Sequence, residues 1–223
     1  MIRFLLLCTI FMVSCSEFEE HETILDYTYY IHEGWVAFET INLNNLSDDN
    51  SYYYDLALEM FNTSIQAIES EFSDQSLLGP YYQSYNGLGW SYLYYAGEFL
   101  GPDYIEVRDS LRNTSKTYFD LAIDDLHNSE FDNISNQDSC DVYLGLAYTN
   151  YYTGLDNLNF DSSLQYSDDL LNLDSLYSFE HDQLDYRNVH YLRGKIFLKT
   201  GDYDQACFEI DKANSCDCAT NDG

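Results

Sequence analysis

The segment from Val189 to Ala213, "VHYLRGKIFLKTGDYDQACFEIDKA", decides the fold of the chain. It begins with a mainly apolar run that carries Gly194 and ends near Lys199, and Gly201-Asp202 then turns the chain. After the turn, apolar residues are spaced by three, four and three, at Tyr203, Ala206, Ile210 and Ala213. This spacing places the four side chains on one face of a helix, so the segment predicts two antiparallel helices joined by a short turn.

The same pattern recurs earlier in the chain with longer connections. Predicted second helices carry three more stripes: Tyr54, Ala57, Phe61, Ser64 and Ile68; Ser115, Phe119, Ala122 and Leu126; and a weaker one at Ser162, Tyr166, Asp169 and Leu170. Predicted first helices carry glycines at Gly34, Gly89 and Gly145. The separations from Ala57 to Gly89, from Ser115 to Gly145 and from Ser162 to Gly194 are 32, 30 and 32 residues. This period predicts an array of about four hairpins.

Glycine within these apolar helices indicates close packing. It costs a helix about 0.5–1 kcal/mol relative to alanine, so it is expected where a neighbouring helix comes near. The stretch "YNGLGWSYLYYAGEF", residues 85–99, contains three glycines. We therefore expect Gly89 to be a packing point between helices and Gly97 to help end its helix.

The final hairpin has small and bulky residues where a tetratricopeptide repeat places them, at Gly194, Phe197, Gly201, Tyr203, Ala206, Ile210 and Ala213. The chain resembles this family over residues 25–213, strongly at the end and loosely before it. "YNGLGWSYL" and "FEHDQLDYRNVHYLRGKIFLKTGDY" are also similar to an uncharacterised group of bacterial repeat lipoproteins. The resemblance implies an all-α fold of antiparallel helical hairpins stacked as a TPR-like α-solenoid. The residues expected to pack the repeats are Gly89, Gly145, Gly194, Ala57, Ser115, Ala122, Ala206 and Ala213.

Residues 1–14 have the pattern of a secretory signal peptide. A basic residue precedes ten apolar residues, which are too few to span a bilayer because a spanning helix needs about 20. The run ends in Met12-Val13-Ser14-Cys15, which resembles a bacterial lipobox and implies that Cys15 is lipidated. Residues 15–24 then form an acidic tether, and Ser16 implies, by resemblance, anchoring to the outer membrane, facing the periplasm or the cell surface. A signal peptide cleaved elsewhere, or a short buried helix, is the alternative.

The charge of the chain is strongly negative, with 39 acidic residues against 9 lysines and arginines and a net charge of −30. No lysine or arginine occurs from Phe4 through Glu106. Such a surface repels polyanions, so nucleic acid is excluded as a partner. Solubility explains the charge better than a dedicated cation site does.

Four cysteines lie beyond the signal and the anchor, at Cys140, Cys207, Cys216 and Cys218. An exported protein meets oxidising conditions, so disulfides are permitted, with three possible pairings. A structural zinc site is the weaker interpretation because the spacing is wrong. Residues 214–223 form a cysteine-containing tail with no helix to cap a repeat array. We therefore expect a disulfide staple or a partner at that end, or a sequence that continues.

Catalytic, phosphate-binding and metal-binding motifs do not occur in their required sequence context. His181 lies between Glu180 and Asp182, which resembles part of an acid–base or metal site. Adjacent residues on a helix point in different directions, so a helix-entry or capping role is the better interpretation. We expect no enzymatic activity, no cofactor and no metal.

Aromatic and basic residues supply the candidate binding groove. Most of the 23 tyrosines are expected to fill spaces between helices. The family resemblance places Trp90 and Tyr94 on the groove side of their helix. It also turns Tyr191, Lys195 and Lys199 toward the groove, where the two lysines share one helix face. Pairing of these lysines with acids of the chain is the favoured interpretation, and binding of a partner's carboxylate is the alternative.

Together these patterns predict a lipid-anchored helical-repeat scaffold that binds a protein or peptide partner at the bacterial cell envelope. The expected ligand is an extended segment whose acidic part meets Lys195 and Lys199 and whose apolar part lies on Trp90 or Tyr94. The alternative is a glycan or nutrient capture lipoprotein of an outer-membrane uptake system, although such proteins are usually much longer.

Overall fold

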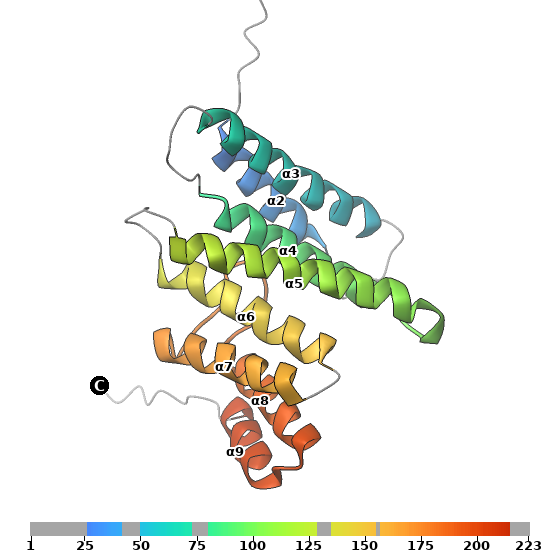
Figure 1. Cartoon of the computed structure of the whole chain (residues 1–223), viewed down its shortest axis with the longest axis vertical. Helices are drawn as coiled ribbons and strands as arrows, with labels where there is room; N and C mark the ends of the chain where they lie inside the picture. The colour runs from blue at the N-terminus through green and yellow to red at the C-terminus, as the bar shows by residue number, and fades with distance from the viewer. Residues whose placement is uncertain (1–25, 42–49, 73–79, 129–134, 155–156, 215–223) are drawn as a thin grey trace, which may run out of the picture.

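The computed structural model describes residues 26–41, 50–72, 80–128, 135–154 and 157–214, and these form an all-helical domain (Figure 1). Its helices are α2 (Tyr27–Thr40), α3 (Asn50–Glu71), α4 (Tyr82–Glu98), the short 3-10 helix η1 (Pro102–Tyr104), α5 (Ile105–Asn128), α6 (Asn136–Thr153), α7 (Asn157–Leu173), α8 (Tyr186–Thr200) and α9 (Tyr203–Asn214). The all-α fold expected from the sequence is confirmed. The predicted signal peptide, Cys15, the acidic tether, Cys216 and Cys218 lie outside the described residues.

Several helix ends follow directly from local sequence. Ser135 caps α6, and its side chain and that of Asp138 satisfy each other's backbone N–H groups. Asp185 caps α8 in the same way together with Asn188. Gly201 ends α8 with a positive φ of 84°, which is the left-handed conformation that glycine adopts most easily. The short turn predicted inside the last hairpin is therefore present.

The helices pack neighbour to neighbour in chain order. α2 packs on α3, α4 on α5, α6 on α7 and α8 on α9, and each pair contacts the next. α2 also contacts α4, α4 contacts α6 and α6 contacts α8, whereas among the described residues α3, α5, α7 and α9 do not contact one another. The first helices of the pairs therefore form an inner layer and the second helices an outer layer. Figure 1 shows the pairs following one another along the long axis, from blue α2 to red α9.

Two phenylalanine rings of the outer layer are seated on glycines of the inner layer. Each ring lies against one glycine of its own pair and one of the next pair: Phe61 against Gly34 and Gly87, and Phe119 against Gly89 and Gly145. Both rings are fully buried. A methyl group added at Gly89 would come within 2.7 Å of the Phe119 ring, which is closer than carbon atoms can pack. The close packing of the two layers thus offsets the cost of placing glycine in these helices.

Serine hydroxyls connect the two layers and fix their register. Ser115 Oγ donates a hydrogen bond to the carbonyl oxygen of Gly89 at 2.7 Å, and Ser163 Oγ donates to that of Ala147 at 2.7 Å. The equivalent of Ser115 in the third pair is therefore Ser163. The predicted stripe that began at Ser162 is wrong by one residue, because serines on both sides of the helix give it a weak apolar signal.

The contact between the third and fourth pairs has its small and large residues in the opposite layers from the contact between the second and third pairs. Ser167 occupies the position in α7 that Phe119 occupies in α5, four residues after the serine that bonds to the inner layer. On α8, the position equivalent to Gly145 is Leu192, and this side chain is fully buried. A small residue in the outer layer is therefore matched by a large one in the next inner helix, which keeps the interior filled.

The last pair is joined partly by buried charge. Glu209 of α9 is 3% exposed, and its Oε2 lies 2.6 Å from His190 Nδ1 on α8. Its Oε1 lies 3.2 Å from Arg193 Nε, and Arg193 also bonds to Asp168 of α7 at 2.5 Å. Burial alone would raise the pKa of Glu209, but His190 and Arg193 lower it below the ordinary value. This cluster ties α7, α8 and α9 together.

Helix α9 is covered on one side only in the described part of the chain. Ala206 is buried and Ala213 is partly buried, and Ile210 lies against Gly194 of α8. Tyr203, predicted to lie in the same apolar stripe, is 68% exposed. That prediction is wrong because the residue begins the helix on the turn side, away from α8.

Candidate functional site

Residues 174–185, which we call the closing segment, connect α7 to α8 and lie on the inner layer. In Figure 1 this segment is the orange trace that leaves α7 and passes behind α6. Tyr177 is fully buried, and its hydroxyl donates a 2.6 Å hydrogen bond to Asp141 Oδ1 of α6. The buried Phe179 ring lies 4.7 Å from the Trp90 ring of α4 and 6.1 Å from the Trp35 ring of α2. Three inner helices therefore hold the segment.

The next residues of the closing segment make polar contacts with the same layer. The His181 ring stacks on Trp35 at a centroid distance of 3.8 Å, and its Nδ1 lies 2.7 Å from Glu39 Oε1. The Tyr94 hydroxyl donates a hydrogen bond to Asp182. The predicted capping role of His181 is wrong, because its imidazole joins two distant elements while a different residue caps α8.

The closing segment covers aromatic side chains of the inner layer that were predicted to be open to a ligand. Trp90 is 0% exposed and Tyr94 is partly buried with its hydroxyl engaged. The prediction that Trp90 faces an open groove is therefore wrong, whereas Tyr94 keeps part of its surface exposed. Phe179 supplies the apolar group that was expected from a partner on Trp90.

A pocket of about 350 Å³ remains beside the closing segment. It lies between α4, α5 and α6, with one wall from the segment itself. Its lining residues are Trp90, Leu93, Tyr94, Gly97, Glu98, Arg112, Tyr148, Tyr152 and Leu184. Its size is at the lower end for small-molecule sites, which are mostly apolar with a few polar groups.

Arg112 is the cation of this pocket. Its guanidinium carbon lies 4.5 Å from the centre of the Tyr152 ring, and its side chain is 19% exposed. The nearest acidic atom in the described part of the chain is Asp109 Oδ1, at 3.7 Å, which is too long for a hydrogen bond. Burial lowers the pKa of Arg112, and the like charge of Arg108 lowers it further. The guanidinium is therefore positioned by the ring and only weakly neutralised.

The other polar groups of the pocket are a carboxylate and an indole. Glu98 Oε1 accepts a 3.1 Å hydrogen bond from the Tyr54 hydroxyl, and no ion pair links Glu98 to Arg112 in the structure described. The buried Trp90 Nε1 has no hydrogen-bond acceptor among the described residues. Burial raises the pKa of Tyr148, so this phenol stays protonated. The pocket thus offers several donors and one acceptor.

The predicted lysine pair lies elsewhere, in a group that we call the lysine patch: Tyr151, Phe160, Tyr191, Lys195 and Lys199. Lys195 Nζ is 4.9 Å from the Tyr191 ring and 5.2 Å from the Tyr151 ring. Lys199 Nζ is 4.2 Å from the Tyr151 ring and 5.3 Å from the Phe160 ring. Neither lysine forms an ion pair with an acid in the described ranges. The favoured internal pairing is therefore not seen for these two residues.

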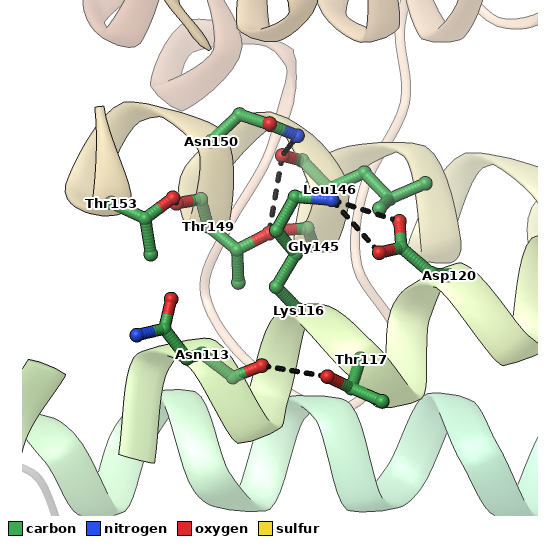
Figure 2. Close-up of polar contacts among 9 residues, drawn as sticks. All are labelled: Asn113, Lys116, Thr117, Asp120, Gly145, Leu146, Thr149, Asn150 and Thr153. Atoms are coloured by element: carbon green, nitrogen blue, oxygen red, sulfur yellow. Dashed lines mark hydrogen bonds and ion pairs between the residues drawn. The ribbon is translucent and has the colours of Figure 1, made fainter. Parts of the chain in front are cut away.

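Other cations of the chain do have acidic partners. Figure 2 shows Lys116 of α5 bonded to both carboxylate oxygens of Asp120, at 2.8 and 3.0 Å. It also shows Thr149 and Asn150 of α6, two buried polar residues whose side chains bond to carbonyl oxygens one turn earlier. These groups are satisfied inside the helices and present no site.

The cysteines described in the structure are not paired. Cys140 is fully buried in α6, with its thiol directed at the Leu170 carbonyl oxygen, and Cys207 is exposed on α9. Cys140 and Cys207 are therefore not bonded to each other, and Cys216 and Cys218 lie outside the described residues. Groups of three or more metal-ligating side chains do not occur in the described ranges.

Two residues of the pocket, Trp90 and Tyr94, were among the predicted binding residues, whereas the others, including Arg112, Tyr148 and Tyr152, were missed by sequence reasoning. Arg112 lies on α5 just before the predicted stripe that begins at Ser115. The scarcity of arginine could have pointed to this residue, because Arg108 and Arg112 are the first arginines after Arg3 in a very acidic chain. Tyr148 and Tyr152 were hidden among many similar tyrosines.

Comparison of the sequence with protein-family models and with curated proteins finds no match. None of the helices in the described ranges has the length and apolar character needed to cross a bilayer.

Proposed function

We propose that this chain is a TPR-like α-solenoid lipoprotein that binds a protein or peptide partner at the bacterial cell envelope. Cys15 would hold it to the outer membrane through a lipid, facing the periplasm or the cell surface. Stacked helical pairs support this proposal because each pair adds surface without changing the packing of the others. The binding role itself rests on the lysine patch.

The lysine patch carries the proposal because its positive charge has no internal partner in the structure described. Lys195 and Lys199 lie one turn apart on α8, and both approach the Tyr151 ring. Burial lowers the pKa of Lys195, and Lys199 lowers it further, which reflects the cost of placing two like charges together. Contact with aromatic faces offsets about 0.5–1 kcal/mol of that cost for each cation. A carboxylate from a partner would offset the rest.

The surface around the lysines also suits a protein partner. Tyr191 is 51% exposed beside Lys195, and Leu198 on the same helix is 46% exposed. Exposed tyrosines are typical of protein interfaces, and the two lysines add a positive charge that acidic residues of a partner would complement. The partner segment is therefore expected to combine acidic residues with an apolar one.

A pull-down from detergent-solubilised envelope membranes tests the proposed function. The full-length protein should retain a specific partner, and the double variant Lys195→Ala, Lys199→Ala should lose it. The matched control is Lys116→Ala, Lys212→Ala, which removes the same charge at other places. Thermal unfolding of each variant distinguishes loss of binding from loss of folding. Equal retention by both double variants would contradict the proposal, and retention of polysaccharide alone would favour glycan capture.

Membrane attachment has its own test. Cys15→Ser should move the protein from the detergent phase to the aqueous phase, because a lipid chain contributes about 0.8 kcal/mol for each buried methylene group. Retention of the variant in the detergent phase would contradict anchoring through this cysteine.

A further inference from the structure

We propose a second site, in the pocket between α4, α5 and α6, that binds a free α-amino acid with an apolar or aromatic side chain. This site does not depend on a protein partner. Its ligand class follows from the charges, the unsatisfied donor and the size of the pocket.

The pocket contains separated opposite charges. Arg112 and Glu98 both line it, yet they do not pair with each other in the structure described. The Arg112 guanidinium makes no hydrogen bond to a carboxylate in the structure described, so its N–H donors are available to the carboxylate of a ligand. Glu98 bonds to Tyr54 through Oε1 only, which leaves Oε2 for an ammonium group. A zwitterion would satisfy both residues at once.

The Trp90 indole provides an independent indication of a ligand. Its side chain has no exposed surface, lines the pocket and carries an N–H without an acceptor among the described residues. A buried donor left unpaired costs about 1–3 kcal/mol, so such groups are rare unless another molecule satisfies them.

Size and long-range charge narrow the ligand class. A pocket of about 350 Å³ admits one amino acid and excludes a peptide of several residues. Leu93, Leu184 and Tyr148 give it apolar walls for a side chain. The net charge of −30 repels anions but not a neutral zwitterion.

Isothermal titration calorimetry with the full-length protein in detergent tests this site. The probes are L-phenylalanine, L-phenylalaninamide, which lacks the carboxylate, and N-acetyl-L-phenylalanine, which lacks the ammonium group. We expect L-phenylalanine to bind at least 10-fold more tightly than either derivative. Equal affinity for the three probes, or no heat of binding up to millimolar concentration, would overturn the proposal.

Two pocket variants test which residue binds the carboxylate of the ligand and which binds its ammonium group. Arg112→Gln should abolish the preference for L-phenylalanine over the amide, and Glu98→Gln should abolish the preference over the N-acetyl derivative. Lys116→Gln is the matched control, because it lies one turn from Arg112 on α5 outside the pocket and should bind like wild type. Unchanged preferences in both pocket variants would overturn the assignment. The lysine patch variant should still bind L-phenylalanine, so failure of the proposed function would not be confused with failure of this site.

Discussion

The middle of the stack and its C-terminal pair are held together in different ways. In the middle, Phe61 and Phe119 fit against glycines of the inner helices, and apolar packing with uncharged hydrogen bonds such as that of Ser115 joins the layers. In the last pair, Glu209 is buried against His190 and Arg193, and charge does much of the joining. The comparison teaches that one repeat pattern can be stabilised by packing or by ion pairs, with different responses to mutation and to pH.

The largest effect is expected from removing a ring in the middle of the stack. Phe119→Ala would leave a cavity between α4, α5 and α6, and should lower the free energy of unfolding by about 4 kcal/mol. Phe208→Ala on α9 is the matched control, because that ring is 53% exposed and its loss should cost far less. Urea denaturation measures both. Similar costs would show that the middle is not held by packing.

The corresponding change in the last pair is Glu209→Gln. It removes the carboxylate that contacts both His190 and Arg193, which should cost about 3 kcal/mol at neutral pH. Because the folded-state pKa of Glu209 is lowered, its contribution is present above the ordinary pKa of 4.5 and is lost as pH falls through the lower value. The difference between wild type and variant should therefore shrink at pH 3.

Thermal melts at pH 7 and pH 3 check this dependence. Glu69→Gln, at an exposed position of α3, is the control and should have little effect at either pH. An equal difference in melting temperature between wild type and Glu209→Gln at both pH values would argue that charge does not hold α8 and α9 together.

Glycine substitutions test whether close packing holds the middle of the stack together. Gly145→Ala would push a methyl group into the Phe119 ring and should cost about 2 kcal/mol. Gly97→Ala, on α4 with open space around it, should instead stabilise the helix by about 0.5 kcal/mol. Denaturant titration gives both values. If Gly145→Ala were also stabilising, glycine would not be required for contact between the layers.

A smaller effect than that of Gly145→Ala is expected at Asp141, which accepts a hydrogen bond from Tyr177 of the closing segment. Burial raises its pKa to about 7, although the hydrogen bond from Tyr177 lowers it. The folded protein therefore binds a proton that the unfolded chain has already lost, and stability falls as pH rises from about 4 to 7. Asp141→Asn keeps the acceptor oxygen without the charge.

At pH 8 this variant should be about 1 kcal/mol more stable than wild type, and at pH 4 the two should be nearly equal. Chemical denaturation at the two pH values measures the difference, with the exposed Asp103→Asn as control. A variant that is less stable at pH 8 would show that Asp141 is favourably ionised.

Periodicity predicted the helical pairs and several of their contacts, because residues such as Phe119 and Ser115 repeat at helical spacing and fall on the buried face. It failed in α7, where serines give no contrast between the faces and the predicted stripe was displaced by one residue. The packing of Gly89 could be predicted from the sequence because glycine destabilises a helix and is therefore expected where another helix packs closely.

The closing segment and the pocket were not accessible in this way. Tyr177 and Phe179 lie in a connection without regular structure, and their burial depends on helices far away in the chain. The family resemblance placed Trp90 on an open groove because the repeat pattern gave no sign that Phe179 packs against the Trp90 ring. Arg112 enters the pocket only once α4, α5 and α6 are together.

Whether the chain closes its own inner layer is tested most directly by hydrogen exchange in the closing segment. The Phe179 N–H donates to the Leu184 carbonyl oxygen and the Tyr186 N–H donates to the Tyr177 carbonyl oxygen, both at 2.8 Å. Both amides should exchange as slowly as those in the middle of α6, because the segment leaves only when the domain opens. Exchange of both amides at the rate of an unprotected chain would contradict this closure and return Trp90 and Tyr94 to an open groove.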